Sequence, residues 1–329
     1  MRWGGLRGFL GGALAAVACA PVFAASGWTL VDVGTLGGPG SYGTAINNSG
    51  VVVGCADVPS GGAHAFIFSG DAIHDLEAGS PPSATSSCAL AVNDLGVAAG
   101  RSSTGEIVIW NRAAVTPLGI QGDVGGIDAA NVVVGSYRDG ASTVAFRYEN
   151  GIVTPIAGPT SAASAINAKG QVVGTLNGRA FLYQDGALHD LGTLGGSASS
   201  AKGVNDHGEI VGMSSNNFGQ PQPFVFDTAM HALPGPSYSS AVAINNSGQV
   251  VGSGEGTYGY LLDGDRYTRL DTLPAVVAKG WRHLEPAGIN DHGWIVGTAT
   301  TPSGDLRAFI LIPSSSERAP VARFARANR

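Results

Sequence analysis

The chain has 329 residues, of which 44% are hydrophobic and only 13% charged, and it contains 51 glycines. This glycine content is roughly twice the average and is typical of short strands joined by tight turns. Residues 25–313 carry 12 basic and 23 acidic side chains, and this acidic balance argues against nucleic-acid binding, which requires a basic surface. Beyond the N-terminal segment, no stretch is apolar for long enough to span a bilayer.

Residues 1–24 have the three parts of a secretory signal peptide. Arg2 and Arg7 form the positive start, an apolar run follows, and Val22-Phe23-Ala24 places small residues at the −3 and −1 positions of a cleavage site. We therefore predict export, to the periplasm or the extracellular space. A retained signal anchor is the alternative. Cys19 also leaves a lipoprotein open, although alanine replaces the leucine that begins a lipobox.

One ten-residue pattern recurs seven times after this segment, at intervals of 35 to 46 residues. Its cleanest copy reads A-I-N-A-K-G-Q-V-V-G, and a worn copy reads G-I-D-A-A-N-V-V-V-G. The copies, numbered 1 to 7 in chain order, begin at Ala45, Ala91, Gly126, Ala165, Gly203, Ala243 and Gly288. A fixed period of this length is typical of a solenoid or a propeller.

Each copy predicts four antiparallel strands, which in copy 4 occupy residues 165–167, 171–174, 180–183 and 188–191. In the first turn the asparagine caps its own backbone and the glycine takes a positive φ. The third strand is apolar on both sides, as in Ala180-Phe181-Leu182-Tyr183. Such a strand belongs to a sheet covered on both faces, which favours stacked propeller blades over a two-layer sandwich.

Copy 7 lacks its fourth strand, because its third strand at 308–312 runs directly into the C-terminus. Residues 30–38 read L-V-D-V-G-T-L-G-G and match L-H-D-L-G-T-L-G-G at 188–196, the fourth strand of a complete copy. We predict that this N-terminal strand pairs with the last copy and removes the exposed sheet edges. The predicted fold is all-β, a closed seven-bladed β-propeller of four-stranded antiparallel blades over residues 25–313.

Residues 314–329 carry four arginines and one glutamate. Because this segment is rich in serine, arginine and alanine, we predict a disordered basic tail that follows the propeller.

Several motifs in the copies resemble the HAF-repeat family of bacterial proteins, named for a His-Ala-Phe tripeptide. His64-Ala65-Phe66 is that tripeptide, Arg179-Ala180-Phe181 and Arg307-Ala308-Phe309 are close variants, and the L-G-T-L-G-G and I-N-x-x-G stretches fit as well. The resemblance covers nearly all of the chain after residue 24. It implies an exported, extracellular protein without an established activity, and it carries over no catalytic residues.

Two cysteines remain after residues 1–24, Cys55 and Cys88. An even number of cysteines in an exported chain is consistent with one disulfide. The predicted meander brings both to the same end of adjacent blades, so this pair is a candidate disulfide. Two free thiols are the alternative.

The sequence offers no constellation typical of catalysis or metal binding. Five of the seven histidines recur at fixed repeat positions, and no spacing resembles a closed metal-ligand set. The Asn-Asp turns lack the alternating ligands of a calcium loop, and no Gly-x-Ser-x-Gly nucleophile motif occurs. We therefore expect no catalytic residue, no metal and no cofactor.

The connections between strands differ at the two ends of the predicted blades. At one end lie short, uniform Asn-x-x-Gly and Asp-Gly turns, whereas the other end carries inserts at 216–220 and 278–285. Function concentrates on variable loops held by a rigid scaffold, and Trp and Arg dominate interface hot spots. The candidate ligand-binding residues are Phe218, Trp281, Arg282, His283 and Glu285. The alternative for the second insert is that its tryptophan fills a gap between blades.

Regular blades with one irregular face favour a non-enzymatic binding or cell-envelope interaction protein. We expect a monomer whose variable face contacts a glycan, a peptide or another protein. The first alternative is a hydrolase or lyase with its site at the central channel, because propellers host many chemistries. A repeat protein without a ligand is the second.

Overall fold

The structure is a computed structural model, and it describes residues 27–78, 86–111, 114–236, 238–254 and 258–314. The predicted signal peptide and nearly all of the predicted basic tail lie outside these ranges. Within them the chain is built almost entirely of antiparallel strands, with one short α-helix and one 3-10 turn.

The first three repeats follow β1 (Trp28–Asp32). Repeat 1 contains β2 (Ser41–Ile46), β3 (Val52–Asp57), β4 (Ala63–Ser69) and β5 (Ala72–Asp75). Repeat 2 contains β6 (Cys88–Val92), β7 (Ala98–Arg101), β8 (Glu106–Asn111) and the first part of β9 (Ala114–Ile127). Repeat 3 contains the rest of β9 together with β10 (Val133–Asp139), β11 (Ser142–Glu149) and β12 (Ile152–Pro159).

The last four repeats are built in the same way. Repeat 4 contains β13 (Ser161–Ile166), β14 (Val172–Leu176), β15 (Arg179–Gln184) and β16 (Ala187–Asp190), and repeat 5 contains β17 (Gly195–Val204), β18 (Ile210–Asn216), β19 (Pro221–Phe226) and β20 (Met230–Ala232). Repeat 6 contains β21 (Ser240–Ile244), β22 (Val250–Gly254), β23 (Tyr258–Asp263) and β24 (Arg266–Arg269). After η1 (Leu270–Thr272) and α1 (Pro274–Lys279), repeat 7 contains β25 (Arg282–Ile289), β26 (Ile295–Thr300) and β27 (Leu306–Pro313).

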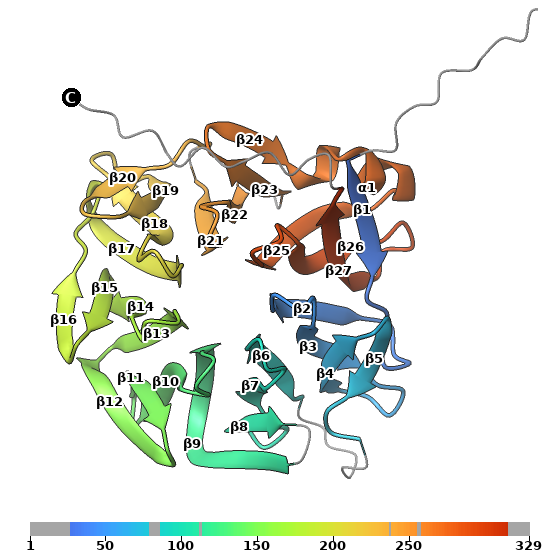
Figure 1. Ribbon diagram of the computed structural model, residues 1–329, viewed down its shortest axis with the longest axis horizontal. Helices are drawn as coiled ribbons and strands as arrows, with labels where there is room; N and C mark the ends of the chain where they lie inside the picture. Colours follow the sequence, from blue (N-terminus) through green and yellow to red (C-terminus); the bar gives the residue numbers. More distant parts are fainter. Residues whose placement is uncertain (1–26, 79–85, 112–113, 237, 255–257, 315–329) are drawn as a thin grey trace, which may run out of the picture.

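Strands pair in chain order within each repeat, as in β13-β14-β15-β16, so the four antiparallel strands predicted from copy 4 are confirmed. Figure 1 shows the sheets arranged about a central opening, with the first strand of each repeat innermost and the fourth outermost. One connection differs from the expected separate blades. β9 pairs with β8 up to Gln121 and with β10 from Gly122, so repeats 2 and 3 share one seven-stranded sheet. The Glu106 carboxylate accepts the Gly119 N–H (2.8 Å) and holds the extended connection against β8.

The N-terminal strand β1 forms the outer edge of the sheet that contains the strands of repeat 7. β1 pairs antiparallel with β27, from Trp28 opposite Pro313 to Asp32 opposite Phe309, and the strand order is β1-β27-β26-β25. Figure 1 shows β1, in blue, beside the red strands of repeat 7. β1 therefore supplies the fourth strand that copy 7 lacks.

The hydrophobic core is divided into layers between neighbouring repeats. One cluster combines Val173 and Ala180 of repeat 4 with Ile210 and Phe224 of repeat 5. A matching cluster joins repeat 7 to repeat 1 through Val296 and other residues. Third-strand aromatic side chains such as Phe224 are fully buried, and each contributes about 1.5–3 kcal/mol by leaving water. Because every sheet is covered on both faces, the two-sided apolar pattern of the third strand is explained.

The last glycine of the ten-residue pattern is required by a close backbone approach. The first strand of each repeat carries a bulge opposite this glycine, as between Ala163 and Ala165 in β13. A Cβ added to Gly174 would lie 2.0 Å from the Ala162 carbonyl oxygen. The equivalent distances are 1.9 Å at Gly54 and 2.1 Å at Gly297. Only glycine fits, because no side chain tolerates that contact.

The asparagine of each first turn links one repeat to the next. Its Oδ1 accepts backbone N–H groups within its own turn, as Asn167 does from Lys169 and Gln171 (3.0 Å each). Its Nδ2 donates to the carbonyl oxygen of the next repeat's turn residue, as Asn167 does to Asn205 (2.9 Å). The same amide-to-carbonyl bond runs from Asn47, Asn93, Asn205, Asn245 and Asn290, the last returning to Asn47 (2.9 Å). In repeat 3 the residue is Asp128, whose carboxylate has no N–H to donate.

A disulfide joins Cys55 of β3 to Cys88 of β6, with Cα atoms 4.6 Å apart. It links repeat 1 to repeat 2 across a sequence separation of 33 residues. The position is a recurring one: Cys55 follows the last glycine of the pattern, and Cys88 lies five residues before the next turn asparagine. The disulfide thus connects the inner strands of two adjacent sheets.

Two other junctions carry a different bridge at this recurring position. Arg101 Nη1 and Asp123 Oδ1 form an ion pair of 3.2 Å between repeats 2 and 3. Thr175 Oγ1 and Ser200 Oγ are 2.8 Å apart between repeats 4 and 5. A covalent bond, an ion pair and a hydrogen bond therefore serve as alternatives at equivalent places.

We predict that Asp128→Asn stabilises the protein. The new amide would donate to the Asn167 carbonyl and complete the series of inter-repeat bonds, with a gain of about 0.5–1.5 kcal/mol. Urea denaturation measures the change in the free energy of unfolding. The opposite substitution, Asn245→Asp, removes the donor of one inter-repeat bond and places a carboxylate at a buried position, so it should cost about 1–3 kcal/mol. Equal stability of all three proteins would contradict the proposed role of the amide.

We predict that Thr175→Cys with Ser200→Cys forms a second disulfide, because these residues occupy the position of Cys55 and Cys88. Mass spectrometry of non-reduced peptides should detect both cross-links, and free alkylation of the introduced pair beside an intact Cys55–Cys88 bond would contradict the equivalence. The engineered bond should raise the free energy of unfolding by about 3 kcal/mol in the chain-entropy account. A reducing agent should abolish that gain.

Candidate functional site

The antiparallel meander gives the molecule two different ends. We call the end that carries the Asn-x-x-Gly turns and the turns between third and fourth strands the turn face. The opposite end, which carries the loops between second and third strands and the connections between repeats, is called the loop face. The predicted inserts at 216–220 and 278–285 both lead to strands that begin at the loop face.

On the turn face, residues from all seven repeats line a central pocket of about 230 Å³. Its rim is made by the second residue of each turn, and these side chains contact one another across repeats. Asn246 Nδ2 donates to both Asp206 Oδ2 (2.9 Å) and Asp291 Oδ2 (3.0 Å). Asn48 Nδ2 donates to Asp291 Oδ2 (3.0 Å) and Asp94 Oδ2 (3.1 Å). The carboxylates of this pocket therefore bind neighbouring amides and stabilise the assembly of repeats.

Titratable groups with shifted pKa values lie far from this pocket. Arg179 donates to Asp190 (2.8 Å), and this bond lowers the pKa of the carboxyl group. Burial raises the pKa of Tyr267 to about 12, and burial also raises that of Tyr260, whose hydroxyl donates to the Ser240 carbonyl (3.1 Å). These groups sit in the outer strands and between sheets. Across the ranges that the structure describes, no three His, Cys, Asp or Glu side chains gather where they could hold a metal ion.

Four of the five predicted binding residues are exposed, and the structure separates them into two groups. Phe218 lies in the loop between β18 and β19 of repeat 5, and its side chain is 87% exposed. Arg282, His283 and Glu285 are exposed at the start of β25 in repeat 7. Repeat 6 stands between these two groups in the chain and in Figure 1. They share the loop face without forming one cluster.

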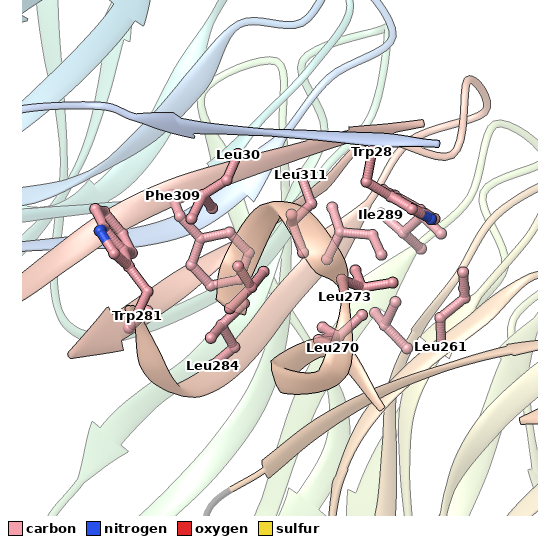
Figure 2. Packing of buried hydrophobic residues seen from close by; sticks show 14 residues of the cluster. Trp28, Leu30, Leu261, Leu270, Leu273, Trp281, Leu284, Ile289, Phe309 and Leu311 are labelled. Carbon is pink, nitrogen blue, oxygen red and sulfur yellow. The ribbon is translucent and has the colours of Figure 1, made fainter. Parts of the chain in front are cut away.

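Trp281 is buried and does not belong to a binding surface. Its side chain is only 8% exposed and belongs to the cluster that contains Trp28 and Leu30 of β1. Figure 2 shows Trp281 at one edge of this cluster and Trp28 at the opposite edge, with Leu30, Phe309 and Leu284 between them. The structure agrees with the alternative interpretation of this insert, in which its tryptophan fills a gap between sheets.

The insert packs over the N-terminal strand and holds it in place. Pro274 begins α1 and Gly280, at φ 67°, ends it, a combination that suits a short helix with a sharp stop. The helix directs Val276 into the same cluster, and Lys279 Nζ donates to the Leu30 carbonyl (2.9 Å). We call residues 270–281 the latch. Residues 270–281, which include Trp281, therefore hold β1 in place.

Exposed aromatic rings are found at the loop face. In the described part of the chain, the exposed Phe and Tyr side chains are Tyr42, Phe218 and Tyr238, and all three lie at this end. Exposed aliphatic side chains such as Leu95 and Ile152 lie on the turn face. Tyr42 and Tyr238 were missed by the sequence analysis. A signal for both existed, because no other repeat has an aromatic Phe, Tyr or Trp at the positions equivalent to Tyr42 and Tyr238, five and seven residues before the turn Asn or Asp.

A cavity of about 500 Å³ lies between repeats 1 and 2 near the turn face. Its wall is mainly apolar and includes Ile67, Trp110 and Val115, with Asp75 at its edge. Asp75 is paired with Nδ1 of His64 (2.9 Å). The cavity is chemically suited to an apolar side chain and lies at the opposite end from the exposed aromatic rings.

We predict that Leu30→Asp destabilises the protein by about 3 kcal/mol or more, because it places a carboxylate in the core under the latch. Thr29→Asp is the matched control, since Thr29 is exposed in the same strand and the change should cost little. Chemical denaturation compares the two variants. Equal stability of both would mean that β1 is not held in this cluster.

No protein-family model matches the chain, and no curated protein matches it in sequence. In the described residues, no helix has the length and apolar character needed to cross a membrane. Among solved structures, the chain is similar to YCF48 bound to a D1 peptide, with a TM-score of 0.52 and 10% sequence identity. The similarity covers 88% of this chain and 97% of that one. At this identity it shows the fold alone: the chain has an all-β, propeller-like architecture.

Proposed function

We propose that this chain is an exported, non-enzymatic binding protein of the cell envelope, whose fold is a closed seven-bladed β-propeller. Closure is supported by the pairing of β1 with β27 and by the bond from the Asn290 amide to the Asn47 carbonyl. Export is supported by the signal-like residues 1–24 and by the Cys55–Cys88 disulfide, since disulfides persist in oxidising compartments. Membership of the HAF-repeat family belongs to the same proposal.

We place the ligand on the loop face, and the exposed aromatic rings carry this part of the proposal. Tyr42, Phe218 and Tyr238 keep large apolar surface in water at one end of the molecule. Exposed aromatic groups on a rigid scaffold are typical of interaction sites. YCF48, which shares the fold, binds a D1 peptide, and this fits a binding role with a peptide or protein partner. The loop-face residues Arg282 and Glu285 add charged groups to the same end, and His283 adds a polar imidazole.

The turn face is less suited to recognition. Its carboxylates accept hydrogen bonds from neighbouring repeats, as Asp291 does from Asn246 and Asn48. A hydrolase or lyase at the central pocket would need carboxylates that are available to a substrate. The proposed protein acts as a monomer that presents its loop face to the ligand.

We predict that ligand binding is lost in a loop-face variant with Tyr42→Ser, Phe218→Ser and Tyr238→Asn. Arrays of glycans and of peptides, probed with the purified protein, identify bound molecules. The matched control changes exposed apolar residues of the turn face, Leu95→Ser and Ile152→Ser, and should bind as the natural protein does. Binding that survives in the loop-face variant, or that disappears in the control, would place the site elsewhere. Substrate turnover that depends on Asp206 and Asp291 would overturn the non-enzymatic proposal.

A further inference from the structure

Three segments at the loop face of repeat 5 form a surface without charge. Residues 192–200 and 214–223, and the described residues 232–236 and 238–240, contain no Asp, Glu, Lys, Arg or His, although the surrounding chain is acidic. β17 and β18 bring the first two segments together, with Gly195 opposite Asn216. The Tyr238 N–H donates to the Pro221 carbonyl (2.9 Å) and joins the third segment to the second. We call this surface the neutral patch.

Phe218 stands at the tip of a rigid turn in the neutral patch. The Asn216 carbonyl accepts the Gly219 N–H (2.9 Å), and the Asn216 N–H donates to the Gln220 carbonyl (2.9 Å). Asn216 Oδ1 also accepts the N–H groups of Phe218 (2.9 Å) and Gln220 (3.0 Å). These are the bonds of the repeat's Asn-x-x-Gly turn, formed here at the opposite end of the sheet. The turn thus presents the phenyl ring in one defined place.

The fold does not require an aromatic residue at this position. Repeats 2 and 7 form the same kind of turn at Ser102–Gly105 and Thr301–Gly304. The residues equivalent to Phe218 are Thr104 and Ser303, both of which are exposed and carry hydroxyl groups. A phenyl ring that is 87% exposed contributes almost no burial to folding. Its presence therefore points to a ligand rather than to packing.

Tyr238 is also unusual for its position. Its φ of 62° is shared by the equivalent residues Thr160 (61°) and His283 (51°), so the repeat itself imposes a left-handed conformation that Gly or Asn adopts more easily than tyrosine. At this position, seven residues before the turn Asn or Asp, every other repeat has a residue smaller than tyrosine, namely Gly40, Ser86, Gln121, Thr160, Ala198 and His283. The Tyr238 ring is nonetheless 52% exposed. Two solvent-exposed rings thus occur in repeat 5 where the fold alone would accept small polar residues.

The chemistry around the two rings matches an uncharged polysaccharide. Sugar rings have faces of C–H groups that pack on aromatic faces, and their hydroxyl groups bond to amides and hydroxyls. The neutral patch offers exposed Asn217 and half-buried Gln220 and Gln222 beside the rings. A peptide hot spot instead fills a desolvated apolar pocket, and the apolar cavity lies at the other end, between repeats 1 and 2. Absence of charge from the patch favours a ligand without charge.

We propose that the neutral patch binds an uncharged polysaccharide, with Phe218 and Tyr238 stacking on its sugar rings. This inference rests on the proposed loop-face binding function and names its ligand class. The amides of Asn217 and Gln220 hydrogen-bond to hydroxyl groups at the edges of the same sugars. The binding step makes and breaks no covalent bond.

The test measures binding to soluble, uncharged hexasaccharides of glucose, mannose and N-acetylglucosamine by isothermal titration calorimetry. We expect at least one of them to bind, with an affinity that hardly changes between about 50 and about 500 mM NaCl, because no ion pair contributes. Phe218→Ser and Tyr238→Asn should each weaken binding about tenfold or more. Tyr238→Asn should keep or raise the melting temperature, because asparagine accepts the positive φ, so a loss of binding cannot come from unfolding.

Leu95→Ser on the turn face is the control and should bind like the natural protein. Hexagalacturonate, a charged hexasaccharide, should bind no better than the uncharged probes. The inference is overturned if no uncharged hexasaccharide binds, if hexagalacturonate binds more tightly, or if Phe218→Ser has no effect. Binding of peptides that is lost in the loop-face variant would refute the polysaccharide while leaving the proposed function intact. Failure of every array probe would refute both.

Discussion

The bond from each turn asparagine to the next repeat's carbonyl is the interaction on which the rest of the structure depends. The asparagine is nearly fully buried at every copy that has it, so both ends of its amide must be paired. Its oxygen shapes the turn that joins the first and second strands, and its nitrogen positions the neighbouring sheet. One side chain thus determines both the local turn and the spacing of the repeats.

This constraint divides the molecule into a structural end and a variable end. The turn face holds the amide bonds and the carboxylates that accept hydrogen bonds from adjacent turns, as Asp206 and Asp291 do. Changing a turn-face side chain would therefore also change the contacts that hold neighbouring sheets together. The loop face carries weaker constraints, because its connections only have to join strands that are already held. The fold can therefore accept exposed aromatic rings at this end, as at Tyr42, Phe218 and Tyr238.

Comparison of equivalent positions distinguishes packing from recognition better than residue type does. Trp281, Arg282 and His283 offered the richest mixture of chemical groups in the sequence, yet the indole of Trp281 lies under β1 with Trp28 and Leu30. Phe218 has the same turn geometry as Thr104 and Ser303 and differs from them only in its exposed ring. Equivalent positions in the other repeats show which residues the fold requires. An exposed residue that differs from them in type therefore points to a role other than packing. Tyr238 departs in the same way, because it shares its positive φ with the equivalent Thr160 and differs in its exposed ring.

Local patterns in the sequence were sufficient to predict the strands and turns. The β-branched runs, the Asn-x-x-Gly turns and the two-sided apolar third strand each depend on neighbours a few residues away, and the match of residues 30–38 to 188–196 identified the strand that joins copy 7. The inter-repeat bridges, the continuous β9 and the burial of Trp281 depend on contacts between segments far apart in the chain. A tryptophan in a loop has the same sequence signature whether it faces solvent or fills a gap. Only the packing of the latch on β1 decided that Trp281 is core, and only the pairing of Tyr238 with Pro221 brought the uncharged segments of repeat 5 into one surface.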